Sequence, residues 1–182
     1  MKDQRSDQVQ QLTPRGSNPF GIVSGGQTGV DRAALDAAHA AGIEAGGWCP
    51  RGRLAEDGVL DARYPLRETP SDDVSQRTRW NVRDSEATLI LHAGEISGGT
   101  ALTRIVALEM KRPVLEVEPG SPDAAYRTVD WIRSNGFTVL NVAGPRESEA
   151  PGIYATALTF LKDLFEQLSG AEGRTPAPSD ER

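Results

Sequence analysis

The sequence predicts a single α/β domain built on a doubly wound, mainly parallel sheet. Short apolar runs alternate with segments of helical periodicity along most of the 182 residues. Glycine-bearing turns follow several of the apolar runs, and the run over residues 87–91 has the pattern of a strand buried on both faces. Strands that alternate with helices pair in parallel through crossover connections, so helices are expected on both faces of the sheet.

Polar segments flank this domain at both ends of the chain. Residues 1–18 are rich in glutamine and polar side chains, and they are predicted to form a disordered N-terminal lead. Residues 169–182 are rich in glycine, proline, serine and charge, and they are predicted to form a disordered C-terminal tail. The folded domain is therefore expected over residues 19–168.

The first two strands and helices follow from periodicity and end signals. Strands are expected over residues 20–24 and 43–48, and the helix between them over residues 28–41, followed by Gly42. Residues 49–67 carry several glycines and prolines and are predicted to form a long ordered loop. The second helix is expected to start with Thr69 as its cap and Pro70 in its first turn.

Three further strands and three further helices complete the domain. The strands are expected over residues 87–91, 113–117 and 137–142. The fourth helix is expected over residues 122–135, and the last helix buries apolar side chains from Tyr154 to Leu168. The third helix opens at residues 97–100, and its expected buried stripe consists of Leu102, Ile105, Val106 and Met110.

Glycine-bearing loops leave the carboxyl ends of three predicted strands, where ligands bind in open α/β sheets. The first loop allows close approach of a ligand, offers side-chain hydrogen bonds and opens a helix whose N–H groups attract anions. It matches neither the P-loop nor the G-x-G-x-x-G pattern, and a tight turn that needs glycine for packing alone is the alternative. Its candidate binding residues are Gly25, Gly26, Gln27, Thr28, Gly29, Asp31 and Arg32.

The second loop repeats this pattern of two glycines and a threonine at a helix N-terminus. Two such turns at one sheet edge indicate a site for a phosphate-bearing or nucleotide-like ligand. Arg146 in the third loop can close over a phosphate, or it can pair with Glu147 or Glu149. The candidate residues of the second loop are Ser97, Gly98, Gly99 and Thr100.

Other polar residues carry weaker signals. Cys49 is interpreted as a small buried side chain, with a reactive thiol as the alternative. His92 follows a strand at the same sheet edge, where it can contact a polar ligand. Asp31 and Glu147 are the candidate acid or base of a hydrolase. With two histidines and one cysteine in the whole chain, no tightly bound, protein-ligated metal is expected.

Charge and cysteine content narrow the function classes. The formal net charge of −6 argues against nucleic-acid binding, which needs a basic face. A single cysteine fits a reducing cytoplasm. The N-terminus lacks the apolar core of a secretory signal, and no apolar run is long enough to cross a membrane. A cytoplasmic protein without a nucleic-acid or membrane partner is expected.

Four motifs lie in order at residues 24–36, 46–53, 97–100 and 141–148. They resemble the motifs of the molybdenum cofactor carrier family, within the superfamily of Rossmann-like domains that includes lysine-decarboxylase-like phosphoribohydrolases and DNA-processing proteins. The resemblance covers about residues 20–165 and implies a single Rossmann-like domain.

This resemblance implies a carrier that binds molybdopterin-type cofactor, with the cofactor's phosphate on the glycine turns. It also implies a homo-oligomer, either a dimer or a tetramer. The alternative is a hydrolase that acts on a nucleotide or a nucleotide-derived signal. The related phosphoribohydrolases have a Pro-Gly-Gly-x-Gly-Thr-x-x-Glu pattern, in which the glutamate serves catalysis. Residues 97–104 of this chain contain neither the proline nor the glutamate. The departure favours carriage over hydrolysis.

Overall fold

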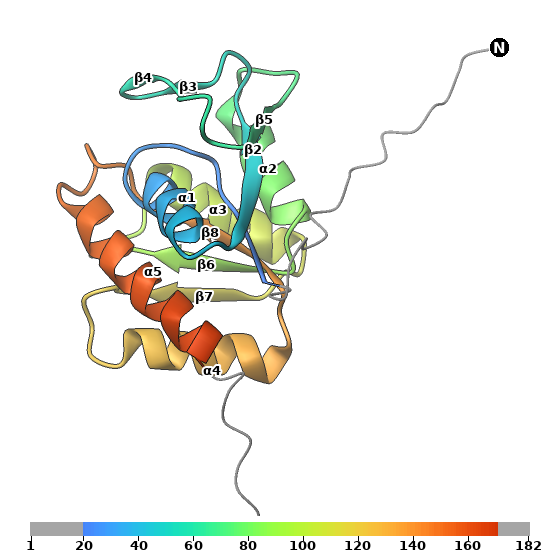
Figure 1. Ribbon diagram of the computed structural model, residues 1–182. Coiled ribbons are helices and arrows are strands. Elements are labelled where there is room, and N and C mark those ends of the chain that lie inside the picture. Colours follow the sequence, from blue (N-terminus) through green and yellow to red (C-terminus); the bar gives the residue numbers. More distant parts are fainter. Residues whose placement is uncertain (1–19, 171–182) are drawn as a thin grey trace, which may run out of the picture.

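A six-stranded parallel sheet forms the centre of the molecule (Figure 1). The computed structural model describes residues 20–170. The strand order is β5-β2-β1-β8-β6-β7, and every neighbouring pair in this sheet is parallel. The six strands are β1 (Gly21–Val23), β2 (Glu44–Cys49), β5 (Leu66–Glu68), β6 (Ala87–Leu91), β7 (Val114–Val117) and β8 (Val139–Ala143).

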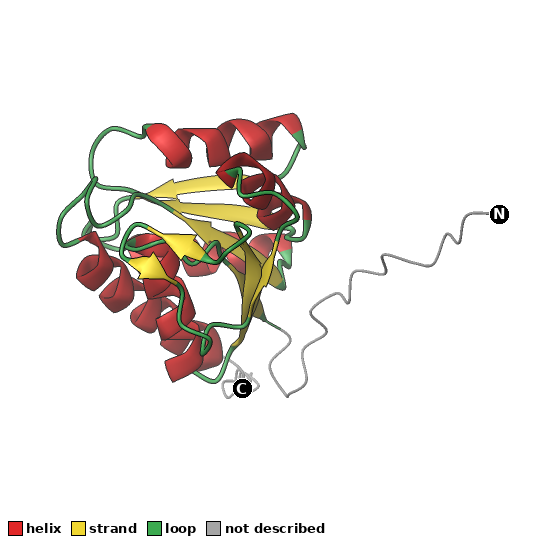
Figure 2. Cartoon of the chain, turned by 90° about the horizontal axis from the view of Figure 1, so that it is seen from above, coloured by secondary structure: helices red, strands yellow, loops and turns green. Residues whose placement is uncertain are grey.

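Helices lie on both sides of this sheet, as Figure 2 shows. On one side α5 packs against both α1 and α4, and on the other side α2 packs against α3. The predicted doubly wound α/β architecture is therefore confirmed. The helices within the described residues are α1 (Val30–Ala40), α2 (Val74–Arg83), α3 (Gly98–Glu109), α4 (Ala124–Asn135) and α5 (Ile153–Gly170).

The predicted N-terminal lead lies outside the described residues, as does all of the predicted tail beyond Gly170. The last helix, α5, extends to Gly170. Between these limits the predicted strands and helices are found within a few residues of their expected positions, with the exceptions described below for residues 49–73 and for α3.

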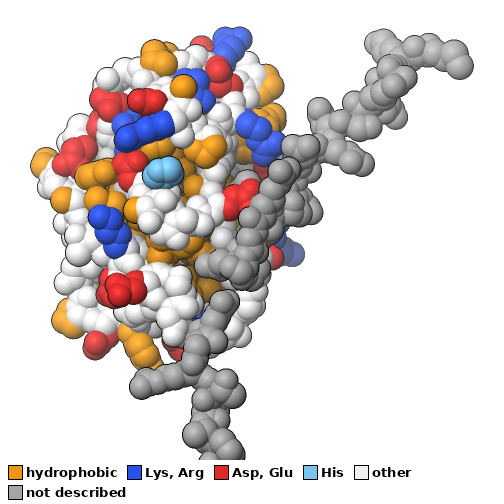
Figure 3. Space-filling model, viewed as in Figure 1, with side chains coloured by type: hydrophobic (Ala, Val, Ile, Leu, Met, Phe, Trp, Pro, Cys, Tyr) orange, Lys and Arg blue, Asp and Glu red, His pale blue; other side chains and the backbone are white. Residues whose placement is uncertain are grey.

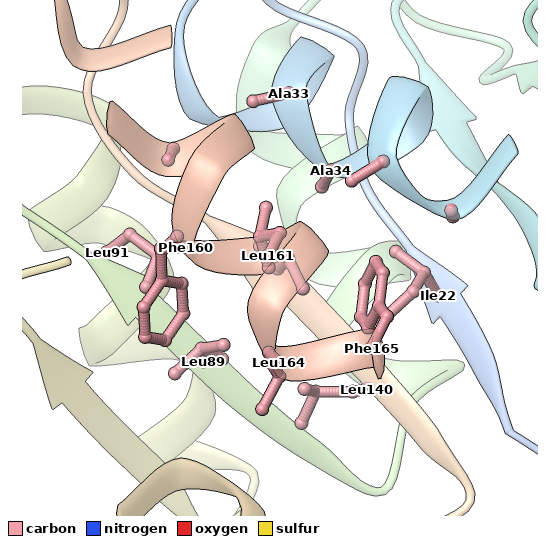
Figure 4. Close-up of a cluster of buried hydrophobic side chains, with 14 of the residues drawn as sticks. Ile22, Ala33, Ala34, Leu89, Leu91, Leu140, Phe160, Leu161, Leu164 and Phe165 are labelled. Atoms are coloured by element: carbon pink, nitrogen blue, oxygen red, sulfur yellow. The ribbon is translucent and has the colours of Figure 1, made fainter. Parts of the chain in front are cut away.

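The main core lies between the sheet, α1 and α5 (Figure 4). Alanines at 33, 34, 37 and 38 form the buried face of α1, so this helix can approach α5 closely. Leu161, Leu164 and Phe165 of α5 fill the space over Ile22 and Leu140. Burial of each large apolar side chain stabilises the fold by roughly 1.5–3 kcal/mol.

The expected start of the second helix is wrong. The helix α2 begins at Val74, and its cap is Asp73, whose side chain accepts a hydrogen bond from the Ser75 amide at 2.9 Å. Thr69 is buried instead, and its hydroxyl donates to the Ser71 carbonyl at 2.8 Å. A carboxylate is a better acceptor for the free amides of a first turn than a hydroxyl that already has a partner.

The expected buried stripe of α3 is also partly wrong. Ile105 is 51% exposed and Met110 is 36% exposed. The buried face consists instead of Val106 with the smaller Thr100, Thr103 and Ala107. Small side chains let the helix lie close to the sheet, so the larger apolar residues are turned outward.

Residues 49–67 contain strands that the sequence did not predict. The strands β3 (Leu54–Ala55) and β4 (Gly58–Val59) form an antiparallel hairpin, and β5 adds an edge strand to the main sheet. These strands are too short to show a period of two. The segment is organised around the Arg53 guanidinium group, which donates to the carbonyls of Leu60, Asp61, Tyr64 and Leu66 at 2.8–3.4 Å.

Candidate functional site

Three glycine-bearing loops meet at one edge of the sheet. They follow β1, β8 and β6, which are neighbouring strands. The chain leaves β1 toward β2 and leaves β6 toward β7, in opposite directions, so this edge is the topological switch point of the sheet. The loop after β8 touches both others. A Cβ on Gly29 would lie 2.4 Å from the Pro145 carbonyl oxygen, and one on Gly98 would lie 3.4 Å from Glu149 Oε1.

The first loop packs closely against a buried ion pair. Arg77 Nη1 of α2 lies 3.1 Å from Asp31 Oδ2, and the side chains are only 15% and 5% exposed. A Cβ on Gly25 would lie 1.7 Å from Arg77 Nη1. Burial raises the pKa of Asp31, and the neighbouring Arg77 opposes that rise. Gly25 therefore lies directly against the ion pair, with no space for a Cβ unless Arg77 moves.

The amides around the N-terminus of α1 have internal acceptors. The Val30 amide donates to the Pro145 carbonyl at 3.3 Å, and the Arg32 amide donates to the Gln27 carbonyl at 3.0 Å. The Thr28 amide donates to the Gln27 side chain at 3.0 Å. The two terminal guanidinium nitrogens of Arg32 each donate a hydrogen bond to one carboxylate oxygen of Asp57, both at 3.2 Å. These bonds hold the first loop in one shape.

The N-terminus of α3 is more open. Ser97 makes no side-chain cap, and Gly98 and Gly99 are exposed. A Cβ on Gly99 would meet no atom within 4 Å, so there is open space beside this residue. The next residue, Thr100, is buried. The first amides of a helix lack partners within the helix and carry its positive dipole end. This turn can therefore accept an anion without disturbing the fold.

Arg146 is linked to this turn through Glu149, whose Oε1 would lie 3.4 Å from a Cβ on Gly98. Its amide donates to Glu149 Oε2 at 3.0 Å, and its Nε lies 4.0 Å from Glu149 Oε1. Both side chains are about 40% exposed. Such an exposed pair contributes little to stability, so Arg146 can exchange Glu149 for a ligand anion.

A cavity of about 690 Å³ opens on the α1 side of the first loop. It lies between the start of α1, residues 56–64, the loop after β8 and the start of α5. On the face seen in Figure 3, acidic and basic side chains lie next to one another. The polar side chains of the cavity wall include Thr28, Arg32, Asp36, Glu56, Tyr64 and Tyr154.

Two carboxylates of this wall join neighbouring segments. Glu56 accepts hydrogen bonds from the Thr28 hydroxyl and from the Ser148 amide and hydroxyl, and these hydroxyl bonds lower the pKa of Glu56. Glu147 accepts from the amides of Gly152 at 2.6 Å and Tyr154 at 3.0 Å, so it caps the first turn of α5.

A third carboxylate, Asp36, is held by two tyrosines. The Tyr64 hydroxyl donates to Asp36 Oδ1 at 3.0 Å, and the Tyr154 hydroxyl donates to Asp36 Oδ2 at 2.8 Å. Arg63 Nη2 lies 3.4 Å from Asp36 Oδ1. Burial, together with Asp36, raises the pKa of Tyr154 to about 12, so this hydroxyl remains a donor at neutral pH.

Comparison with known proteins places the chain in a family. A model of the circularly permutated YpsA SLOG family matches residues 22–165. The chain belongs to this family. A crystal structure of a protein from Syntrophus aciditrophicus SB, named a "Putative molybdenum carrier protein", is 44% identical in sequence, with a TM-score of 0.77. The similarity covers 80% of this chain and 94% of that one. No curated protein matches the chain.

Cys49 and His92 are the remaining candidate residues from the sequence. Cys49 is fully buried, and burial raises the pKa of its thiol. His92 is partly buried, and its Nδ1 lies 2.9 Å from the Gly94 carbonyl oxygen. Within residues 20–170 no group of three or more His, Cys, Asp or Glu side chains could hold a metal ion. In the same residues no helix is long and apolar enough to cross a membrane.

Several residues of the candidate site were missed by sequence reasoning. Arg77 reaches the first loop from 46 positions later in the chain, and Glu56 reaches it from the hairpin segment. Neither contact leaves a signal in local spacing. For Asp36 a signal existed, because it lies four positions after Arg32 and therefore on the same face of α1.

Proposed function

We propose that this protein binds and carries a phosphate-bearing ligand, the molybdenum cofactor, at the glycine-rich loops of the switch-point edge. The observation that carries this proposal is the open N-terminus of α3, where Gly98 and Gly99 are exposed and Gly98 lies close to Glu149, the ion-pair partner of Arg146. A helix N-terminus with free amides is a ready site for a phosphate group. The name of the related Syntrophus aciditrophicus protein supports molybdenum carriage as the purpose of such a site.

The two glycine loops have different parts in this proposal. The second loop, Ser97 to Thr100, holds the phosphate directly through backbone amides, with Arg146 released from Glu149 to pair with it. The first loop, Gly25 to Arg32, forms the adjoining wall. Gln27 and Thr28 are partly exposed, and Asp31 acts through Arg77, which it holds against Gly25.

The hydrolase alternative has weaker support. Its two candidate acid or base groups are engaged elsewhere, since Asp31 is paired with Arg77 and Glu147 caps α5. A general base must be within reach of the proton that it removes. The polar groups of the site are therefore better suited to holding a ligand than to turning it over.

We also propose that the carrier is a cytoplasmic homo-oligomer, a dimer or a tetramer. Ile105 and Leu108 on α3 are 51% and 62% exposed. A second copy that covers them would remove adjacent apolar surface from water. Neither nucleic acid nor membrane is proposed as a partner.

Native mass spectrometry of the protein purified from its own cells tests this proposal. It reports the bound ligand and the assembly in one measurement. The expected result is an oligomer whose protomers carry a mass that matches the cofactor and that contains molybdenum and phosphorus. A protein that carries an unmodified nucleotide instead, or that never retains a phosphorylated ligand, contradicts the proposal.

A further inference from the structure

The cavity beside the first loop differs in charge from the open turn of α3. Four carboxylates and two guanidinium groups line it, so the acidic groups outnumber the basic groups by two. A phosphate group would be repelled by this excess of like charge. The cavity is better matched to the uncharged part of a ligand that presents N–H donors. The carboxylates are Asp36, Glu56, Asp57 and Glu147, and the guanidinium groups belong to Arg32 and Arg63.

Three of the four carboxylates are already committed to the fold. Glu56 joins Thr28 to Ser148, and Glu147 caps α5. Asp57 receives both nitrogens of the Arg32 fork. A ligand that donated hydrogen bonds to these carboxylates would have to break internal hydrogen bonds. These three groups therefore shape the cavity and are not available to bind a ligand.

Asp36 has capacity left for a ligand. An ionised carboxylate accepts about four hydrogen bonds, and the two tyrosine hydroxyls supply two of them from fixed positions. The third donor, Arg63, is 64% exposed and lies 3.4 Å away, so it can be replaced at little cost. The tyrosines therefore orient a carboxylate that is 23% exposed at the cavity wall.

We infer that Asp36 binds the donor edge of a 2-amino-4-oxopyrimidine ring, the ring edge that pterins and guanine share. On that edge the amino group and the neighbouring ring N–H point the same way, so they can donate two parallel hydrogen bonds to one carboxylate. A volume of about 690 Å³ is within the range of small-molecule sites. The inference deepens the proposed function and rests on it, because the cavity begins at Thr28 and Gly29 of the first glycine loop.

Four unphosphorylated probes test the inference with the full-length protein. Pterin and guanosine carry the 2-amino group, whereas lumazine carries an oxygen at that position and inosine carries a hydrogen. We expect pterin to bind at least tenfold more tightly than lumazine, as measured by isothermal titration calorimetry. If guanosine is preferred over inosine by that factor and pterin is not preferred over lumazine, the ring edge is confirmed and its source is a guanine nucleotide.

Matched variants separate the role of Asp36 from general effects. Asp36→Asn keeps the shape but turns a donor toward the ring, so pterin binding should weaken at least tenfold and the discrimination against lumazine should disappear. Glu166→Gln makes the same change at an exposed position on α5 and should leave binding unchanged. Melting temperatures of both variants report whether the fold is intact, and Tyr154→Phe, which removes one orienting bond, should weaken pterin binding less than Asp36→Asn.

Two results would overturn the inference. One is equal binding within each probe pair, or no binding of any probe at millimolar concentration. The other is an Asp36→Asn variant that melts like the wild type and binds pterin equally well. Failure of the proposed function looks different, since the probes lack phosphate. In that case the ring discrimination persists, whereas the protein does not retain molybdenum cofactor.

Discussion

The substitution Gly25→Ala tests whether the first loop is built around the buried Asp31–Arg77 pair. The added methyl group would lie 1.7 Å from Arg77 Nη1 and 2.8 Å from Asp31 Oδ2. Since non-bonded heavy atoms approach to about 3.5 Å, the guanidinium group must retreat by about 1.8 Å. A shift of this size lengthens the present separation of 3.1 Å between Arg77 Nη1 and Asp31 Oδ2 beyond hydrogen-bond range.

The expected cost follows from the burial of Asp31. Its side chain is 5% exposed, and the loss of one partner from a buried pair costs about 3–5 kcal/mol. At about 2–4 °C per kcal/mol for a domain of this size, the melting temperature should fall by about 6–20 °C. An unpaired Asp31 would have a further raised pKa and would be protonated more readily. The difference from the wild type should therefore narrow as the pH is lowered from 7.5 to 5.

A double-mutant cycle measured by differential scanning calorimetry isolates this contact. Arg77→Met removes the two closest clashing atoms and leaves Asp31 Oδ2 at 2.8 Å, so Gly25→Ala should cost clearly less in that background than in the wild type. Gly120→Ala is the matched control, because its added methyl group meets nothing within 4 Å. A Gly25→Ala protein that melts within about 2 °C of the wild type, or an equal cost in both backgrounds, would refute the reasoning.

Three other substitutions probe the supports of the site. Arg53→Met leaves four carbonyls without their donor, so residues 54–66 should exchange amide hydrogens faster than in the wild type, and unchanged protection contradicts this role. Glu147→Ala removes the α5 cap and should cost about 0.5–2 kcal/mol in urea unfolding; no loss of stability contradicts the assignment. Hydrogen bonds lower the pKa of Glu56 below 4.5, so its stabilisation is present above that pH and is lost as the pH falls through the lowered value. Melting curves of Glu56→Gln should therefore approach those of the wild type in acid, and a constant difference between pH 7 and pH 3 opposes that account.

Much of the fold was predictable because long elements repeat their pattern. The strand over residues 87–91 was found at its expected bounds. The helix expected over residues 122–135 begins at Ala124 and ends at Asn135 as expected, with Gly136 in the left-handed conformation. The edge strand β5 was not predictable, since three residues that include an arginine and a glutamate show no period. The outward turn of Ile105 depends on how closely α3 approaches the sheet, which spacing alone does not determine.

The candidate site was predictable in position and less so in its contacts. The glycine motifs identified the loops, and topology brings them to one edge. The partner of Asp31 could not be found from the sequence, because Arg77 lies on a helix that packs against the opposite face of the sheet from α1. The difference between a closed first loop and an open second loop likewise depends on tertiary hydrogen bonds.

The most direct test of the central claim is the affinity of the Gly99→Asp protein for molybdenum cofactor, compared with that of Gly99→Asn. Neither side chain meets another atom near its Cβ, and the two differ mainly in charge. The negative charge of an aspartate in the first turn interacts favourably with the positive end of the helix dipole, so the stability of the fold should be kept or raised. If the phosphate binds at the N-terminus of α3, Gly99→Asp should bind the cofactor at least tenfold more weakly than Gly99→Asn. Equal affinity of the two variants would contradict the claim.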